Sequence, residues 1–301
     1  MSHEELERRP VIQTVTDAAA RIQDGITLGV GGFINSGHPM ALVRQVIRNG
    51  VRDLTVVGPA SSGLEVDLLI AAGCVKRVIA PYVGAEGLVP IGPAFQAASQ
   101  SGQLEVWEVD EAMYYAGLRA SAQRLPFNPW RSGIGTSYPE INRDLVEFID
   151  PVRGERLLAV PAIELNVAIL HAAVSDNYGN VQHNGTGYGD RAIYAAADYT
   201  IVEVEQLVSV EQIQRNPAAT SIPGANSVVR APFGAHPFSS EGYYPPDVIA
   251  LQEYIEAARP LRRGDRQPIE DYLRRYVLEP EDHIAYLEQI GLSRLMSLSE
   301  Y

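Results

Sequence analysis

The chain has 301 residues and a formal net charge of −13 at pH 7, with 46% hydrophobic and 20% charged residues. This balance is typical of a globular protein with a sizeable core. The acidic charge argues against a nucleic-acid partner, which needs a basic face. The single cysteine, Cys74, excludes a disulfide framework and a cysteine-based zinc site.

The first ten residues, "MSHEELERRP", are charged and polar and lack the apolar segment of a signal peptide. No apolar run approaches the ~18 residues of a membrane span. We therefore expect a cytoplasmic protein with no membrane partner, in keeping with its lone cysteine.

Short apolar runs that end in glycine alternate with amphipathic stretches in the first part of the chain. The strand-like runs are "ITLGVGG" (26–32), "DLTVVG" (53–58) and "VKRVIAPYVG" (75–84). Between them, residues 40–50 and 64–73 place apolar side chains at helical intervals. This order predicts an α/β fold, an open and mostly parallel sheet with helices on both faces. Ligands of such sheets lie beyond the carboxyl ends of the strands.

The later segments extend this pattern. Further strands are predicted at 103–110, within 156–176 and at 199–209, with a Gly/Pro-rich loop at 125–140. After the Pro-Pro pair that begins at Pro245, the apolar spacing becomes helical. We expect an α/β domain over residues 1–245 and a helical C-terminal extension over 246–301, packed on the core or on a partner.

A glycine cluster follows the first of these strands, in "DGITLGVGGFINSGHP" (24–39). A dinucleotide fingerprint would need glycine three residues after Gly31, where the chain has Ile34, and no Gly-Lys-Ser/Thr of a phosphate loop follows. Both nucleotide interpretations therefore fail.

The same glycines suit an oxyanion-stabilising loop. Gly31 and Gly32 lack side chains, so we expect their backbone N–H groups to point at a ligand oxygen. Phe33 would cover one flank of the ligand, and Asn35 would offer its amide. A tight strand-to-helix turn without a ligand is the alternative.

The stretch 24–39 resembles the signature of the α subunit of class I CoA-transferases. That signature is Asp/Asn-Gly, two free positions, three apolar residues, Gly-Gly-Phe, three free positions and Gly-x-Pro. The one departure is Gly29, where the family has an apolar residue. "SDNYGN" and "GLRASAQRLPFNPWRSGIGT" resemble two further segments of the family. The resemblance implies the CoA-transferase-like fold for roughly residues 10–245.

In that family the nucleophile is a glutamate in a Ser-Glu-Asn-Gly motif of the β subunit. This chain lacks the motif, and "SSEGYY" (239–244) echoes it only superficially. The resemblance therefore implies that this chain is one subunit of an enzyme and is active only with a homologous β subunit. The implied assembly is a heterotetramer of two α and two β subunits. It implies no permanently bound cofactor and no metal, with coenzyme A present as part of an acyl-CoA substrate.

Residues 108–137 further resemble the α subunit of actinobacterial enzymes that open the last carbocyclic ring of cholesterol-derived CoA thioesters by hydrolysis. Hydrolytic ring opening is therefore the implied activity. CoA transfer of the 3-oxoacid or glutaconate type is the alternative, and a non-catalytic CoA-thioester-binding role is a remote one. Four aromatic residues suit a bulky alicyclic acyl group or belong to the core: Tyr114, Tyr115, Phe127 and Trp130.

Glu105 is the carboxylate that we expect to be catalytic. It shares a strand face with Trp107, and a glutamate in a largely buried strand beside a tryptophan suits general-base chemistry. The alternative is an edge strand in solvent, or a structural pair with Arg119 or Arg131. Both arginines are also candidate anchors for a substrate carboxylate, with structural ion pairs as the alternative.

Other titratable residues show no motif. We expect capping or core roles, not metal binding, for the four histidines that lie far apart in the sequence, His38, His171, His183 and His236. Glu203 and Glu205 share one face of a predicted strand, for which we expect a solvated or paired setting.

Overall fold

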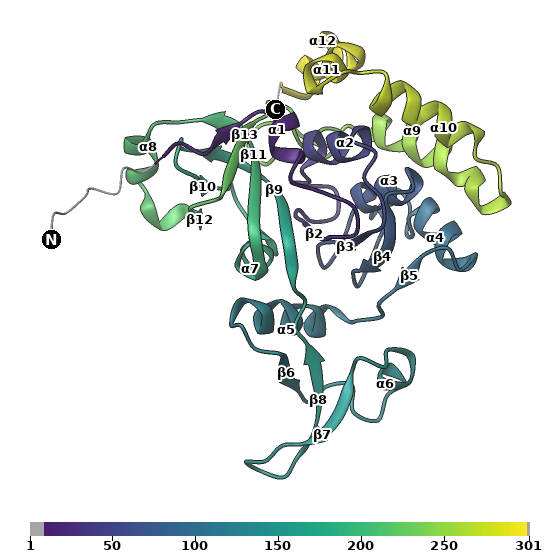
Figure 1. The fold of residues 1–301 in the computed structure, drawn as a ribbon. Coiled ribbons are helices and arrows are strands. Elements are labelled where there is room, and N and C mark those ends of the chain that lie inside the picture. The colour runs from purple at the N-terminus through teal and green to yellow at the C-terminus, as the bar shows by residue number, and fades with distance from the viewer. Residues whose placement is uncertain (1–8, 300–301) are drawn as a thin grey trace, which may run out of the picture.

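The computed structural model describes residues 9–299, and one large sheet forms its centre (Figure 1). Eight strands are joined in a parallel series, in the order β1-β13-β11-β9-β2-β3-β4-β5. Their bounds are Ile12–Gln13 (β1), Ser227–Arg230 (β13), Ala197–Leu207 (β11), Leu165–Ser175 (β9), Thr27–Val30 (β2), Leu54–Val57 (β3), Val75–Ile79 (β4) and Glu105–Val106 (β5). Antiparallel β10 (Asn180–Gln182) pairs with β9, and β12 (Thr220–Pro223) pairs with β10.

Helices cover both faces of the sheet, because the buried strands are apolar on both sides. Val56 and Val78 pack into a core with α1 (Val15–Ala19), α2 (Met40–Arg48), α3 (Leu64–Ala71) and α4 (Pro93–Gln100). Val57 and Ile79 face a second core with α5 (Glu111–Ala122) and α7 (Asp190–Ala196). Short α8 (Val210–Gln214) and η1 (Pro217–Ala219) precede β12. The predicted open, mostly parallel α/β fold is confirmed.

The chain ends in a series of helices, of which α9, α10 and η3 pack on the core formed by α2 and α3 (Figure 1). These are α9 (Val248–Ala258), η2 (Arg259–Arg263), α10 (Gln267–Leu273), the π-helical turn η3 (Arg274–Leu278), α11 (His283–Ile290) and α12 (Leu292–Ser299). Leu251, Ile255 and Val277 belong to the same apolar core as α2 and α3. In residues 9–299 no helix combines the length and apolar character that crossing a membrane requires.

A small antiparallel sheet projects from the core beyond α5 (Figure 1). Its strands are β6 (Phe127–Trp130), β8 (Arg156–Pro161) and β7 (Val146–Ile149), in the order β6-β8-β7, and α6 (Tyr138–Ile141) lies in the connection. The sequence predicted a loop over 125–140. The strand there was missed because β6 is an edge strand with Pro129 at its centre and no buried residue.

Candidate active site

The glycine loop follows β2 at the carboxyl edge of the sheet. The N–H of Gly31 donates to the carbonyl oxygen of Ile169 (2.9 Å), and the N–H of Gly32 donates to Oδ1 of Asp190 (3.0 Å). Both amides are therefore already used within the chain. The expectation that they face a ligand oxygen is wrong.

Close packing explains why these positions are glycine. A Cβ on Gly31 would lie 2.7 Å from Asp190 Oδ1, and one on Gly32 would lie 2.4 Å from Nδ1 of His38. Gly32 also has a φ of +105°, which disfavours other residues. At Gly29, a Cβ would lie 2.8 Å from Leu165 Cδ1, so neighbouring side chains already fill the space that the family gives to an apolar residue.

Phe33 and Asn35 occupy the outer part of the loop. The Phe33 ring stacks on Tyr188, with centroids 4.8 Å apart and planes at 8°. Nδ2 of Asn35 donates to the carbonyl oxygen of Glu86 (3.2 Å), while its backbone N–H has no partner among residues 9–299. Asn35 therefore keeps an unused backbone donor.

A cavity opens beside this loop. It is lined by Gly32, Ser36, Gly37, His171, Ala172, Ala173, His183, Asn184, Thr186, Tyr188, Asp190, Ser240 and Glu241. Val30, the last residue of β2, pairs with Ile169 of β9, so His171 lies level with the start of the loop. The cavity therefore lies at the carboxyl edge, where ligands of such sheets bind.

His171 is the buried centre of a charged cluster on the cavity wall. Its Nδ1 lies 3.1 Å from Oε1 of Glu203, and its Nε2 lies 3.0 Å from Oγ of Ser240 and 3.3 Å from Oε1 of Glu205. Burial alone would lower the pKa of His171, but its hydrogen bonds to the two carboxylates raise it to about 9. His171 is therefore an imidazolium at neutral pH.

This charge state determines how Ser240 is used. Both ring nitrogens of an imidazolium are donors, so Nε2–H of His171 donates toward the Ser240 oxygen. The hydroxyl hydrogen of Ser240 is then free to donate to another group. Ser240 is only 3% exposed and lines the cavity, so an oxygen bound there is within its reach.

The two carboxylates also hold the surrounding backbone. Oε2 of Glu203 accepts the N–H of Leu42 (3.0 Å), and Oε2 of Glu205 accepts that of Phe233 (2.7 Å). The hydroxyl of Tyr244 donates to Glu205 Oε1 (2.5 Å). We expected a solvated or paired setting for Glu203 and Glu205, and in the structure both are paired and buried.

His183 forms a second polar chain in the cavity lining. Its Nε2 lies 3.1 Å from Oδ2 of Asp190, whose other oxygen accepts the Gly32 N–H. Its Nδ1 lies 2.6 Å from Oγ of Ser221. Because both nitrogens are occupied, His183 orients Asp190 and the glycine loop. No group of three possible metal ligands occurs in residues 9–299.

Glu241 is the cavity carboxylate that has no cationic partner in residues 9–299. Its side chain accepts one long hydrogen bond, from the N–H of Thr186 (3.4 Å). The segment is fixed beside the glycine loop, where Gly37 N–H donates to Ser239 O (2.8 Å) and Ser239 N–H donates to Asn35 O (2.9 Å). The "SSEGYY" segment therefore contributes Ser240 and Glu241 to the cavity.

Glu105 lies elsewhere. It pairs in register with Arg77 of β4, and through Thr55 of β3 with Thr27, the first residue of β2. It is therefore near the amino edge of the sheet, three strand spacings or ~14 Å sideways from β2. Its side chain is 57% exposed, and its Oε1 lies 3.1 Å from Nε of Arg77. The expectation of a buried Glu105 is wrong, because β5 is the edge strand.

The predicted arginines and aromatics are also outside the cavity lining. Arg131 lies at the end of β6 and pairs with Glu155 (2.6 Å), while Arg119 is exposed on α5 and forms no ion pair in residues 9–299. Tyr114 is fully buried, and its hydroxyl donates to Gly58 O (2.6 Å), so it is a core residue. Phe127 is 36% exposed in the small sheet.

The sequence contained one unused signal for this site. His171 interrupts the apolar strand "LNVAILHAAVS", and Glu203 interrupts the neighbouring strand of the sheet. In the structure these two residues are direct register partners. Polar residues inside otherwise apolar parallel strands indicate a buried network.

The chain has a parallel sheet, a glycine loop after β2 and a polar cavity at the carboxyl edge of the sheet. These features are typical of open-sheet α/β proteins that bind a ligand at that edge. The chain belongs to the coenzyme A transferase family, whose model matches residues 12–228.

Two curated relatives align with nearly the whole chain. A glutaconate CoA-transferase subunit from Acidaminococcus fermentans is 31% identical over 306 residues, covering 95% of this chain and 94% of the relative. The cholesterol ring-cleaving hydrolase IpdA subunit of Mycobacterium tuberculosis is 34% identical over 289 residues, covering 92% and 97%.

Solved structures give the same assignment. The crystal structure of glutaconate coenzyme A-transferase from Acidaminococcus fermentans matches with a TM-score of 0.89 at 30% identity, over 97% of this chain and 96% of that one. A variant of the decarboxylase AibA/AibB matches with a TM-score of 0.77 at 30% identity, over 88% and 100%. Proteins named for different reactions therefore share this fold.

Proposed function

We propose that this chain is the α subunit of a heteromeric enzyme that, with a β subunit, opens a ring of a steroid-derived acyl-CoA by hydrolysis. The 34% identity to the cholesterol ring-cleaving hydrolase subunit supports this choice. The observation that carries it is that the cavity lining contains both a hydroxyl donor, Ser240, and a carboxylate that has no cationic partner in residues 9–299, Glu241. Transfer through a β-subunit glutamate also passes through a tetrahedral oxyanion, so Glu241 is the group of this pair that favours hydrolysis.

The proposed reaction is a hydrolytic retro-Claisen cleavage. Glu241 takes a proton from water, whose oxygen bonds to the ring ketone carbon and gives a tetrahedral oxyanion. The oxyanion then collapses to a C=O double bond, so that the former ketone carbon becomes part of a carboxyl group. At the same time the adjacent ring C–C bond breaks, and its electron pair forms an enolate with the neighbouring carbonyl group. Protonation of that carbon by the Glu241 carboxylic acid completes the addition of one water, and the thioester stays intact.

Ser240 is the proposed oxyanion donor in place of the glycine amides. The neighbouring imidazolium of His171 donates to Oγ of Ser240, which polarises its hydroxyl. A donor fixed in a buried wall stabilises developing charge without reorganising, and losing one costs ~2.7–4 kcal/mol in the barrier.

CoA transfer between an acyl-CoA and a carboxylate is the alternative. The full-length match to glutaconate CoA-transferase favours it, at 31% identity and a TM-score of 0.89. In that case the nucleophile would be a β-subunit glutamate, and this chain would shape the acyl site. Neither activity requires a permanently bound cofactor.

The test uses the complex of this chain with its co-purifying β subunit. The complex is incubated with a CoA thioester that carries a cyclic β-diketone, with and without an acceptor carboxylate, and the products are weighed by mass spectrometry. A product heavier by one water with its thioester intact supports hydrolysis. CoA on the acceptor, with borohydride-sensitive inactivation of a β-subunit glutamate, would replace the proposal with transfer. Binding without either product would replace it with a non-catalytic role.

A further inference from the structure

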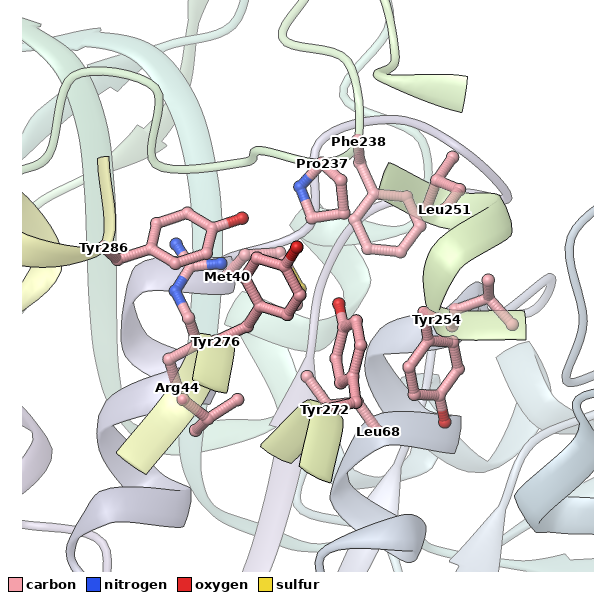
Figure 2. A pocket seen from close by; sticks show the side chains of 12 residues that line it. Met40, Arg44, Leu68, Pro237, Phe238, Leu251, Tyr254, Tyr272, Tyr276 and Tyr286 are labelled. Atoms are coloured by element: carbon pink, nitrogen blue, oxygen red, sulfur yellow. The ribbon is translucent and has the colours of Figure 1, made fainter. Parts of the chain in front are cut away.

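A second cavity lies where α2 meets the C-terminal helices (Figure 2). It is lined by Met40, Arg44, Leu64, Leu68, Pro237, Phe238, Leu251, Tyr254, Tyr272, Tyr276, Val277 and Tyr286. Most of its wall is apolar or aromatic, and Arg44 is its one cationic side chain. The residues come from both the α/β core and the C-terminal extension.

Arg44 is a buried cation without a carboxylate partner. It is 2% exposed and forms no ion pair with any of residues 9–299. Its Nη1 donates to the carbonyl oxygen of His236 (2.9 Å), and its Nη2 lies 3.3 Å from Nδ1 of His283. The guanidinium lies 3.6 Å from the ring centre of Tyr286 (Figure 2). None of these contacts neutralises its charge.

Two donors at this cavity are unused. Nε of Arg44 has no hydrogen-bond partner in residues 9–299, and neither has the hydroxyl of Tyr272. Figure 2 shows the Tyr272 hydroxyl directed toward Pro237 and Phe238. By contrast, the Tyr276 hydroxyl already donates to Glu253 (3.0 Å). The cavity therefore offers a positive charge and free donors.

We propose that this cavity binds one small inorganic anion, a halide such as chloride, between Arg44 and Tyr272. The cavity measures about 20 Å³, which holds one guest of about the size of a water molecule. A buried cation is costly unless it is paired, and a halide supplies the missing charge and accepts both free donors. The apolar remainder of the wall disfavours a larger, strongly hydrated oxyanion.

The bound anion would link two parts of the chain. Arg44 lies on α2, the helix that directly follows the glycine loop, and Tyr272 lies on α10 of the C-terminal extension. A halide between them stabilises the folded chain by mass action, because the unfolded chain has no such site. The extension would then be held against α2 in a halide-dependent way.

The test is thermal unfolding of the full-length chain, with its β subunit where the two co-purify. Sodium chloride is titrated against sodium gluconate at constant ionic strength. We expect a saturable rise in Tm that is specific to chloride and bromide. Tyr272→Phe should weaken the halide response about tenfold, since a hydrogen bond to a charged group is lost. Tyr276→Phe is the matched control, because its hydroxyl already donates to Glu253.

Crystals grown or soaked in bromide provide an independent measurement. An anomalous bromide peak within hydrogen-bonding distance of Arg44 Nε supports the proposal. Equal Tm values in chloride and gluconate, or a site that holds only an ordered water, would overturn it. A halide response of equal size in the Tyr272→Phe and Tyr276→Phe variants would also overturn it.

Discussion

His38 and Glu65 contact each other beneath the glycine loop, with His38 Nδ1 3.3 Å from Glu65 Oε2 and both side chains fully buried. Burial lowers the pKa of His38 to about 4 and raises that of Glu65 to about 8. Both are therefore mainly uncharged at neutral pH. The ring nitrogens of His38 also contact Gly31 O (2.9 Å) and Ile34 O (3.0 Å), so this neutral pair supports the loop.

Glu65 makes the stability of the fold depend on pH. Its pKa is raised from 4.5 to about 8 on folding, so between these values the unfolded chain releases a proton that the folded chain keeps. The contribution is fully present below pH 4.5 and is lost as the pH rises toward 8. Glu65→Gln should therefore raise the unfolding free energy by roughly 2–4 kcal/mol at pH 8 and flatten its pH dependence.

Chemical denaturation at several pH values between 4.5 and 8.5 measures this effect. The exposed Glu288→Gln is the matched control and should leave the profile unchanged. A Glu65→Gln protein that is less stable than the wild type at pH 8 would show that Glu65 is ionised and paired in the fold.

His171 adds a second pH dependence at higher pH. Although burial lowers its pKa, hydrogen bonds to Glu203 and Glu205 raise it from 6.5 to about 9. Its contribution is therefore fully present below pH 6.5 and is lost as the pH rises through 9. We expect Glu205→Gln to remove much of the fall in Tm between pH 7 and 9.5. An unchanged alkaline profile in this variant would mean that His171 is neutral in the fold.

Glu241 should be essential for hydrolysis, because it is the cavity carboxylate that has no cationic partner in the described part of the chain. In the complex with the β subunit, we expect Glu241→Gln to lower kcat by about 10²–10⁴, the usual range for losing a general base. Glu105→Gln serves as the control and should keep normal activity, since Glu105 lies at the opposite edge of the sheet. The measurement is kcat of both variants by steady-state kinetics. A large loss of kcat in Glu105→Gln with normal kcat in Glu241→Gln would instead identify Glu105 as the base.

Ser240 should act on the transition state more than on substrate binding. Ser240→Ala is expected to reduce kcat by about 10²–10³ with little change in KM, as for a lost oxyanion donor. Ser239→Ala is the neighbouring control, since the Ser239 hydroxyl donates to Asn35 O (3.1 Å) and not into the cavity. Equal effects of the two substitutions would instead indicate a general disturbance of the segment.

Gly32 should be required for folding of the loop and not for an amide contact with substrate. In Gly32→Ala, the new Cβ would lie 2.4 Å from His38 Nδ1 at a φ of +105°, so strain and overpacking add. We expect a loss of about 2–5 kcal/mol in the unfolding free energy. Gly102→Ala, at a φ of +73° with no atom within 4 Å, should lose only about 1–2 kcal/mol. Urea unfolding of both variants measures these losses. Equal losses of unfolding free energy in Gly32→Ala and Gly102→Ala would contradict the packing argument.

The amino-acid sequence by itself determined the layers of this fold. The apolar runs 26–32, 53–58 and 75–84 became β2, β3 and β4, and the amphipathic stretches between them became α2 and α3. These features follow from local periodicity, which depends on neighbouring residues only. The same logic placed the glycine loop at the carboxyl edge, since it directly follows β2.

Tertiary structure alone decided which side chains meet at that edge. Glu105 has the pattern of a buried strand residue, but β5 lies at the end of the strand order, which local sequence does not encode. Ser240 reaches His171 across 69 positions, and Gly37 binds Ser239 across an even longer separation. Contacts over such distances depend on how strands and loops pack in three dimensions. For this reason the glycine loop was predictable from the sequence, while the residues facing its cavity were not.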